Sequence, residues 1–149
     1  MCGIIGTLDW SGQHPPEMGL LLRMLSIVQH RGPDECGFYV DRRLGMGCAR
    51  LSIIDLCTGQ QPIHNEDRSL WIVYNGEVYN YPELRESLAA RGHTFTTQSD
   101  TEVLLHLYED RGPGFLDQLN GQFAIAIWDV RSRSLFLARD RLGIRPLFY

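Results

Sequence analysis

The spacing of apolar residues predicts helices in four parts of the chain. Residues 17–29 carry apolar side chains every three or four positions, which form one stripe that we expect to face a core. This stripe consists of Met18, Leu21, Leu22, Leu25 and Val28. A second helix is expected after a capping box of Asn80 and Glu83, and a third after Asp100, interpreted as its N-cap. The fourth is a short helix at 115–119.

Short apolar runs between these helices predict β-strands. Polar turns join 36–40 to 44–51 and 123–128 to 135–138, so each pair is expected to form an antiparallel hairpin. The remaining expected strands are 4–5, 70–74, 93–97 and one that begins at 147–149. The polar, turn-rich stretch 56–69 suits a loop that lies over a site.

Composition narrows the classes of function. The 149 residues, of which 44% are hydrophobic, suffice for one domain with a core. The 14 basic and 18 acidic residues give a net charge of −4, so neither a nucleic-acid partner nor an anionic membrane is expected. No apolar run approaches the length of a bilayer span, and the first residues lack the pattern of a signal peptide. A function with small molecules is therefore favoured.

The cysteines indicate a reducing compartment rather than a metal or disulfide framework. Cys2, Cys36, Cys48 and Cys57 show no CxxC spacing and no accompanying histidine pair, so no metal site is expected. A disulfide framework is not expected in a domain of this size with this hydrophobic content. We expect reduced thiols and a cytoplasmic location, with the last three cysteines as packing or loop residues.

Cys2 follows the initiator methionine, and this position suggests a nucleophile. Removal of Met1 would leave Cys2 with both a thiol and a free α-amine. The unperturbed pKa values are about 7.7–8.0 for the amine and about 8.5 for the thiol, so the amine can relay the thiol proton near neutral pH. Position alone also allows the alternative that Cys2 is a small residue at a frayed end.

Two further polar features stand next to apolar strands. Asn75-Gly76 follows the run 70–74, and such a pair usually forms a tight hairpin turn. The segment after it leads into a helix instead of a returning strand, which weakens that interpretation. Arg50 lies among apolar residues and needs a partner, because a guanidinium stays charged and is costly to bury alone.

Five short motifs occur in one order along the chain. They are Met1-Cys2-Gly3-Ile4, Arg31-Gly32-Pro33-Asp34, Arg50-Leu51-Ser52-Ile53, Tyr74-Asn75-Gly76-Glu77 and Ser99-Asp100-Thr101-Glu102. Together they resemble the glutaminase domain of glutamine-dependent asparagine synthetases, which are class II amidotransferases with an N-terminal nucleophile. Tyr74 and Glu77 resemble this branch more than the branches that make glucosamine phosphate or phosphoribosylamine. The resemblance implies an α+β fold, a four-layer αββα sandwich of the N-terminal-nucleophile hydrolase type.

The resemblance also implies catalytic roles. Cys2 would attack the side-chain amide carbon of glutamine, form a γ-glutamyl thioester and release ammonia, after which water would free glutamate. The side-chain amide of Asn75 and the backbone N–H of Gly76 would hold the oxyanion. No cofactor or metal is implied for these steps.

A second group of residues would recognise the substrate by its two charges. Arg50 would pair with the α-carboxylate of glutamine in a fork geometry. Asp100 and Glu77 would take the α-ammonium, and backbone groups near Leu51 and Ile53 would complete the pocket. Opposite charges in one site suit a zwitterionic ligand.

Full-length members of the resembled family carry a second, C-terminal domain that binds ATP and activates aspartate. Residues 1–149 contain no Ser-Gly-Gly-x-Asp-Ser type phosphate loop and stop where we expect a strand to begin. We therefore expect an N-terminal fragment that ends before its domain is complete and is unstable alone, with ATP and magnesium needed only by the missing synthetase domain. Aspartate, or another carboxylate, would accept the ammonia, and a homodimer is a possible assembly. The alternatives are a non-catalytic glutamine sensor and a self-processing hydrolase, although only Met1 precedes Cys2.

Overall fold

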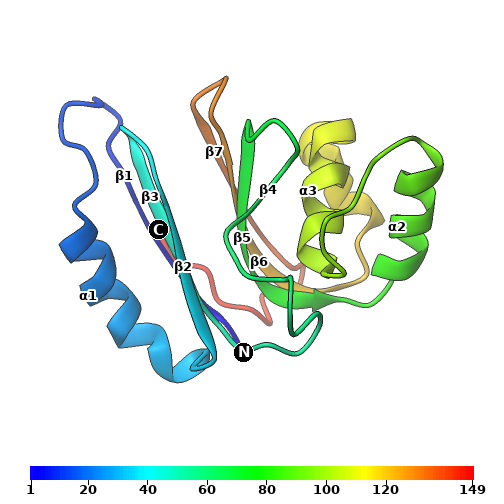
Figure 1. The fold of residues 1–149 in the computed structure, drawn as a ribbon, viewed down its shortest axis with the longest axis horizontal. Coiled ribbons are helices and arrows are strands. Elements are labelled where there is room, and N and C mark those ends of the chain that lie inside the picture. Colours follow the sequence, from blue (N-terminus) through cyan, green and yellow to red (C-terminus); the bar gives the residue numbers. More distant parts are fainter.

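The computed structural model describes residues 1–149 and contains two antiparallel sheets that face each other (Figure 1). The first sheet has the order β1-β3-β2, and the second has the order β4-β5-β6-β7. Strands of the first sheet are β1 Gly3–Leu8, β2 Glu35–Val40 and β3 Leu44–Arg50. Those of the second are β4 Ile63–His64, β5 Leu70–Val78, β6 Gly121–Asp129 and β7 Ser134–Arg139.

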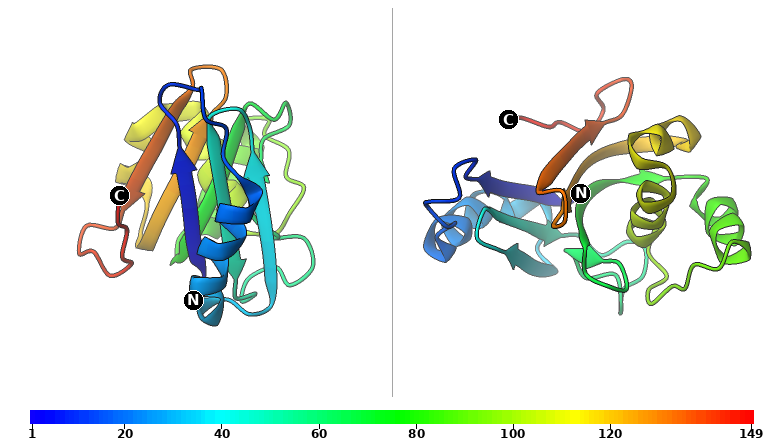
Figure 2. Two further views of the ribbon diagram at one scale, coloured as in Figure 1. Left: turned by 90° about the vertical axis from the view of Figure 1, so that its left-hand side faces the viewer. Right: turned by 90° about the horizontal axis from the view of Figure 1, so that it is seen from above.

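Helices cover the outer face of each sheet. The helix α1 (Met18–Val28) lies on the first sheet, α3 (Asp100–Arg111) lies on the second, and α2 (Tyr81–Ala90) packs beside α3. The view from above in Figure 2 shows these layers in succession, helix, sheet, sheet and helices. The expected α+β, four-layer αββα sandwich is therefore confirmed. None of the helices is both long and apolar enough to span a membrane.

Two apolar clusters hold these layers together. The cluster between the sheets consists of Leu44, Met46, Cys48, Val73, Ala126 and Trp128. A larger cluster lies between the second sheet and its helices and includes Ile72, Tyr74, Leu104 and Phe115. Successive residues of β5 alternate between the two clusters, because side chains of a strand point to opposite faces. Burial on both faces makes β5 a rigid support for whatever it carries.

The helix α1 is close to its expected position, but its buried face is narrower than predicted. Leu21 and Leu25 are buried, whereas Met18 is 46% exposed and Leu22 is 52% exposed. The main contacts of α1 are with β1 and β3 of the first sheet and with the turn that follows the helix, so the opposite side of α1 is left exposed. Leu21 lies directly over Gly45, where an added Cβ would come within 2.6 Å of it.

The hairpins β2–β3 and β6–β7 are confirmed, but β5 differs from the prediction. It continues from Leu70 through Asn75 and Gly76 to Val78, paired with β6 along its whole length. The Asn-Gly pair is therefore neither a hairpin turn nor the end of a strand. Pairing with a long neighbouring strand overrides the local turn preference of Asn-Gly.

Two expected strands are absent, at 93–97 and at 147–149. In the first segment, the backbone N–H groups of Thr96 and Thr97 donate to the carboxylate of Glu102 on α3, at 2.8 and 2.7 Å. These hydrogen bonds replace those of a strand ladder. The expected short helix at 115–119 is a 3₁₀ helix over Gly112–Gln118.

One predicted helix cap is wrong, and the other lacks its capping hydrogen bond. The N-cap of α3 is Ser99, whose side chain accepts from Thr101 N, and Asp100 is the first residue of the helix. Asn80 is the N-cap residue of α2, as predicted, but its side chain makes no capping hydrogen bond. Its side chain donates to Gln118 O and accepts from Asn120 N, so it ties the start of α2 to the segment before β6.

Candidate active site

A pocket opens where the start of β1, the end of β3, the middle of β5 and the start of α3 meet. All the site residues named from the sequence line it. They are Cys2, Arg50, Leu51, Ile53, Asn75, Gly76, Glu77 and Asp100. The N-terminus lies beside this end of the two sheets in Figure 1. Residues separated by almost a hundred positions therefore surround one small space.

Cys2 is held in the pocket by its backbone. Arg31 Nε donates to the Cys2 carbonyl oxygen at 3.1 Å, and β1 begins at the next residue, Gly3. An added Cβ at Gly3 would come within 2.8 Å of Val28, so glycine permits the close approach of β1 to the end of α1. The Cys2 Sγ lies 3.8 Å from Leu51 O and is oriented into the pocket.

The surroundings of Cys2 favour its thiolate. A hydrogen bond from the Cys48 thiol is the largest cause that lowers the pKa of Cys2, to about 6. A backbone hydrogen bond at Leu51 and the positive charges of the N-terminus and Arg50 lower this pKa further, while burial opposes them. A thiol with such a pKa is largely ionised at neutral pH and is a competent nucleophile.

Cys48 is a site residue that the sequence did not reveal. It is fully buried between the sheets, and its hydrogen bond to Cys2, together with burial, raises its pKa well above the ordinary value. In the β1–β3 register, Ile4 lies opposite Cys48, which places Cys48 on the same face of the sheet as Cys2. Sequence spacing gives no sign of this pairing, because it depends on which strands are neighbours.

Asn75 and Gly76 occupy the central strand of the second sheet. Asn75 is only 4% exposed, and its side chain lines the pocket. An added Cβ at Gly76 would overlap the carbonyl oxygen of Gln122 and lie 2.7 Å from the Cα of Phe123. Glycine is thus required here by the close approach of β6, independently of any role in chemistry.

The buried guanidinium of Arg50 has the partner that its sequence context demands. Its Nη1 donates to Glu35 Oε2 at 2.7 Å. Its Nη2 donates to the carbonyl oxygens of Ile54 and Asp55, at 2.8 and 2.6 Å. A guanidinium has five N–H groups, so the Nε–H and one Nη1–H remain for a ligand. Glu35, at the start of β2, was not identified from the sequence.

Asp100 projects from the first turn of α3 into the pocket. Its Oδ2 accepts from the Tyr74 hydroxyl at 2.8 Å and from Val78 N at 3.3 Å. Burial raises the pKa of Asp100, the hydrogen bond from Tyr74 opposes this shift, and the nearby charge of Glu77 adds to it. Two carboxyl groups at one side of the pocket create a negative potential that suits an ammonium group.

Further lining residues come from segments that the sequence left without a role. Gln61, from the loop before β4, accepts from Tyr74 N at 2.6 Å and so attaches this loop to β5. Arg145 reaches the pocket from the last loop, whose shape depends on the Asp140 carboxylate. That carboxylate accepts from the backbone N–H groups of Ile144 and Arg145, at 2.9 and 3.0 Å.

Comparisons with known proteins agree with this geometry. Residues 1–149 match the family described as "Glutamine amidotransferase domain". The chain is 46% identical to asparagine synthetase [glutamine-hydrolyzing] 2 of Bacillus subtilis, covering 100% of this chain and 20% of that protein. It is 40% identical to asparagine synthetase [glutamine-hydrolyzing] 2 of Arabidopsis thaliana, covering 99% of this chain and 25% of that protein. The chain therefore spans about a fifth to a quarter of these relatives' length.

The fold also matches a solved structure. It superposes with a TM-score of 0.77 on glutamine phosphoribosylpyrophosphate amidotransferase from B. subtilis, solved with ADP and GMP. The sequences are 23% identical, and the match covers 98% of this chain and 38% of the other. At this level of identity, the likeness concerns the fold.

Proposed function

Because the chain belongs to the glutamine amidotransferase domain family, we propose that it hydrolyses glutamine to glutamate and ammonia through a thioester on Cys2. One observation carries the proposal. The Cys2 thiol lines a pocket whose wall also contains a buried cation, Arg50, and a buried carboxyl group, Asp100. A ligand that fits has one negative and one positive group at one end and an electrophilic carbon at the other, as glutamine does.

In the proposed reaction, the Cys2 thiolate attacks the side-chain amide carbon of glutamine and forms a C–S bond. The oxyanion accepts hydrogen bonds from the Asn75 side-chain amide and the Gly76 N–H. The α-amine of Cys2 holds the proton that the thiol has lost. It passes this proton to the leaving nitrogen, and ammonia departs. Water then attacks the thioester, releasing glutamate and restoring the thiol.

Removal of Met1 is part of this proposal. Met1 lines the pocket beside Cys2, so its removal would both free the α-amine and enlarge the space for substrate. With Met1 retained, an amide nitrogen would stand where the base is needed. The pocket contains no histidine that could replace it.

Substrate recognition would use the charges that the fold has already placed. Arg50 would bind the α-carboxylate with its free Nε–H and Nη1–H. Asp100 and Glu77 would hold the α-ammonium, with backbone groups at Leu51 and Ile53 closing the pocket. Glu35 already forms an ion pair with Arg50. The α-carboxylate of glutamine would therefore join this existing ion pair as a second anionic partner of Arg50.

The named relatives suggest where the ammonia goes. We propose that the complete protein uses it to make asparagine from aspartate with ATP and magnesium, bound outside residues 1–149. Another carboxylate acceptor is the alternative within the same architecture. All four cysteines are free thiols, which suits a cytoplasmic location.

The proposal is tested with Cys2→Ala and Cys2→Ser in the protein at its natural full length. Both variants should lose glutamate release and thioester formation yet still bind glutamine, because the binding groups lie on other elements. The exposed Cys36 provides the matched control, and Cys36→Ala should keep full activity. Intact mass should show a mature chain without Met1. Appreciable hydrolysis by Cys2→Ala would exclude Cys2 as the nucleophile, and wild-type binding without turnover would indicate a sensor.

A further inference from the structure

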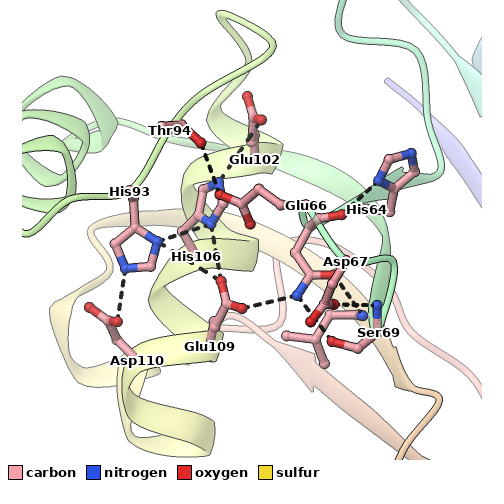
Figure 3. Close-up of polar contacts among 12 residues, drawn as sticks. His64, Glu66, Asp67, Ser69, His93, Thr94, Glu102, His106, Glu109 and Asp110 are labelled. Atoms are coloured by element: carbon pink, nitrogen blue, oxygen red, sulfur yellow. Dashed lines mark hydrogen bonds and ion pairs between the residues drawn. The ribbon is translucent and has the colours of Figure 1, made fainter.

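Two histidines and a glutamate converge at α3 (Figure 3), and none of the three lines the pocket of Cys2. His106 and Glu109 lie on α3, and His93 belongs to the loop that follows α2. The His93 Nδ1 lies 3.2 Å from the His106 Nδ1, and the His106 Nδ1 lies 3.3 Å from Glu109 Oε2. The third separation, from His93 Nδ1 to Glu109 Oε2, is 3.9 Å.

These separations suit three ligands of one metal ion. Ligand atoms at about 2.0–2.1 Å from a tetrahedral zinc lie roughly 3.3–3.4 Å from one another. The two shorter separations are close to this value, and the third needs only a small rotation of the Glu109 side chain, which is 34% exposed. Imidazole nitrogens with a carboxylate oxygen are a donor set that zinc accepts.

The geometry brings three donor atoms to one point. The Nδ1 atoms of His93 and His106 face each other at 3.2 Å, and Glu109 Oε2 lies 3.3 Å from the His106 Nδ1. The other ring nitrogens point away from this point: His93 Nε2 lies 2.8 Å from Asp110 Oδ1, and His106 Nε2 is buried without a hydrogen-bond partner. A cation between the two Nδ1 atoms and the Glu109 oxygen would contact all three donors.

The groups behind two of the ligands have the arrangement that metal sites use. Asp110 stands behind His93, with its Oδ1 2.8 Å from His93 Nε2. A carboxylate in this position orients a ligand ring and raises its basicity. Asn65 Nδ2 donates to Glu109 Oε1 at 3.0 Å, which holds the third ligand.

Negative charge exceeds positive charge around this cluster. Four carboxyl groups surround the imidazoles, those of Glu66, Glu102, Glu109 and Asp110 (Figure 3). Glu66 accepts a hydrogen bond from the Thr94 hydroxyl at 3.1 Å on the same side of the cluster. The only cationic side chain paired with these groups is Arg91, which contacts Asp110. A divalent cation would compensate this excess.

We propose that His93 Nδ1, His106 Nδ1 and Glu109 Oε2 bind one divalent metal ion of the zinc class, with water in the remaining position. The ion fastens the loop before α3 to the helix that presents Asp100 to the pocket, and its role is structural. Sequence analysis predicted no metal site, because it considered the cysteine spacing and did not single out His93 and His106, which are 13 residues apart. The fold brings them together through the return of the chain from α2 to α3.

The test measures zinc bound by the protein at its natural full length after treatment with a chelator and addition of zinc chloride. Glu109→Gln is the main variant, because glutamine keeps the side-chain length and one carbonyl oxygen, which can accept from Asn65 Nδ2, but lacks the charged ligand. It should bind one equivalent less zinc than the wild type. His30→Gln, at an exposed histidine outside the cluster, is the matched control and should bind as the wild type does.

A second variant and a second measurement keep the proposal testable even if Glu109→Gln misfolds. Asp110→Asn removes a ring-orienting carboxylate and should weaken zinc binding about 10- to 100-fold without abolishing it. Zinc should raise the melting temperature of the wild type by several degrees but not that of Glu109→Gln. The proposal is overturned if the wild type binds no zinc, or if Glu109→Gln and Asp110→Asn both bind zinc with wild-type stoichiometry and affinity.

Discussion

Cys2 owes its low pKa to a residue on a neighbouring strand. The thiol of Cys48 is buried at the inner face of β3 and donates to Cys2, while Arg50 at the end of the same strand adds a positive charge. One strand therefore supplies both the hydrogen bond and the charge that favour the thiolate. Because Cys48 keeps its own proton, it acts as a donor and not as a second nucleophile.

We predict that Cys48→Ala raises the pKa of Cys2, because the Cys48 hydrogen bond is the largest of the causes that lower this pKa to about 6. Since the thiolate is the reactive form, the acidic limb of the kcat/KM profile for glutamine hydrolysis should move to higher pH. Cys48→Ser keeps a donor and should move the limb less, and Cys36→Ala should not move it. A limb at the same pH in Cys48→Ala would show that this hydrogen bond does not tune Cys2.

The proposed oxyanion and recognition residues should separate in their kinetics. Removal of one oxyanion donor costs about 10²–10³ in turnover, so Asn75→Ala should lose mainly kcat. Arg50→Lys and Asp100→Asn should mainly raise KM and weaken discrimination against glutamine analogues that lack the α-carboxylate or the α-amine. Steady-state kinetics with glutamine and these analogues measure both effects. If all three variants changed only kcat, this division of roles would be wrong.

At the scale of elements, the last loop depends on a single carboxylate. Burial raises the pKa of Asp140, but hydrogen bonds from the backbone N–H groups of Arg145, Ile144, Phe123 and Leu142 outweigh it and lower the pKa. The same carboxylate therefore attaches the loop to β6 and positions Arg145 at the pocket.

Asp140→Asn keeps one acceptor oxygen in place of two, so we expect a loss of about 1–3 kcal/mol in the free energy of unfolding at pH 7. Because the folded pKa of Asp140 is lowered, its contribution is present above the unfolded pKa of about 3.9 and is lost as pH falls through the folded value. The difference between the wild type and Asp140→Asn should therefore shrink below about pH 4. Urea unfolding at several pH values measures this. Asp117→Asn, in an exposed ion pair, is the control and should change little.

The pairing of β5 with β6 leaves no room for a side chain at residue 76. Gly76→Ala would push a methyl group against Gln122 and Phe123 of β6, so β5 must shift and Asn75 shifts with it. We expect lower unfolding free energy and lower activity together. Gly114→Ala is the matched control, because no atom lies within 4 Å of its added Cβ. A stable, fully active Gly76→Ala protein would contradict this account.

At the scale of the whole molecule, the two sheets are joined by an apolar cluster and by a partly buried polar contact. Trp128 of β6 packs against the first sheet, and its Nε1 donates to Asp41 Oδ2 in the β2–β3 turn at 2.7 Å. This contact connects residues 87 positions apart. The pocket lies between the same two sheets, so its width depends on their packing.

Trp128→Phe should remove this hydrogen bond and leave a smaller ring in the cluster, at a cost of about 1–3 kcal/mol in the free energy of unfolding. Trp10→Phe serves as the control, because Trp10 is 77% exposed. Chemical denaturation with a single transition should report the loss for Trp128→Phe alone. An equal effect of the two substitutions would mean that the Trp128 contact does not join the sheets.

The local pattern of apolar and polar residues determined several elements of the fold. The hairpins β2–β3 and β6–β7 and the position of α1 follow from hydrophobic periodicity and short turns, which depend on neighbours in sequence. The five motifs also resembled a known family, and that resemblance implied the αββα fold and the residues that line the pocket. The motifs themselves are recognised from the sequence alone, because each carries its own residue types and spacing.

Tertiary structure decided the contacts between distant segments. The Cys2–Cys48 pair, the Arg50–Glu35 pair and the convergence of His93 with His106 all join residues on different elements. Packing also overrode the local conformational preference of two segments. Asn75-Gly76 stays in the strand β5 instead of forming a turn, and the segment 93–97 donates to Glu102 instead of forming a strand. The physical reason is the same in each case. A buried polar group takes the partner that the folded chain brings within reach, and sequence spacing does not encode that distance.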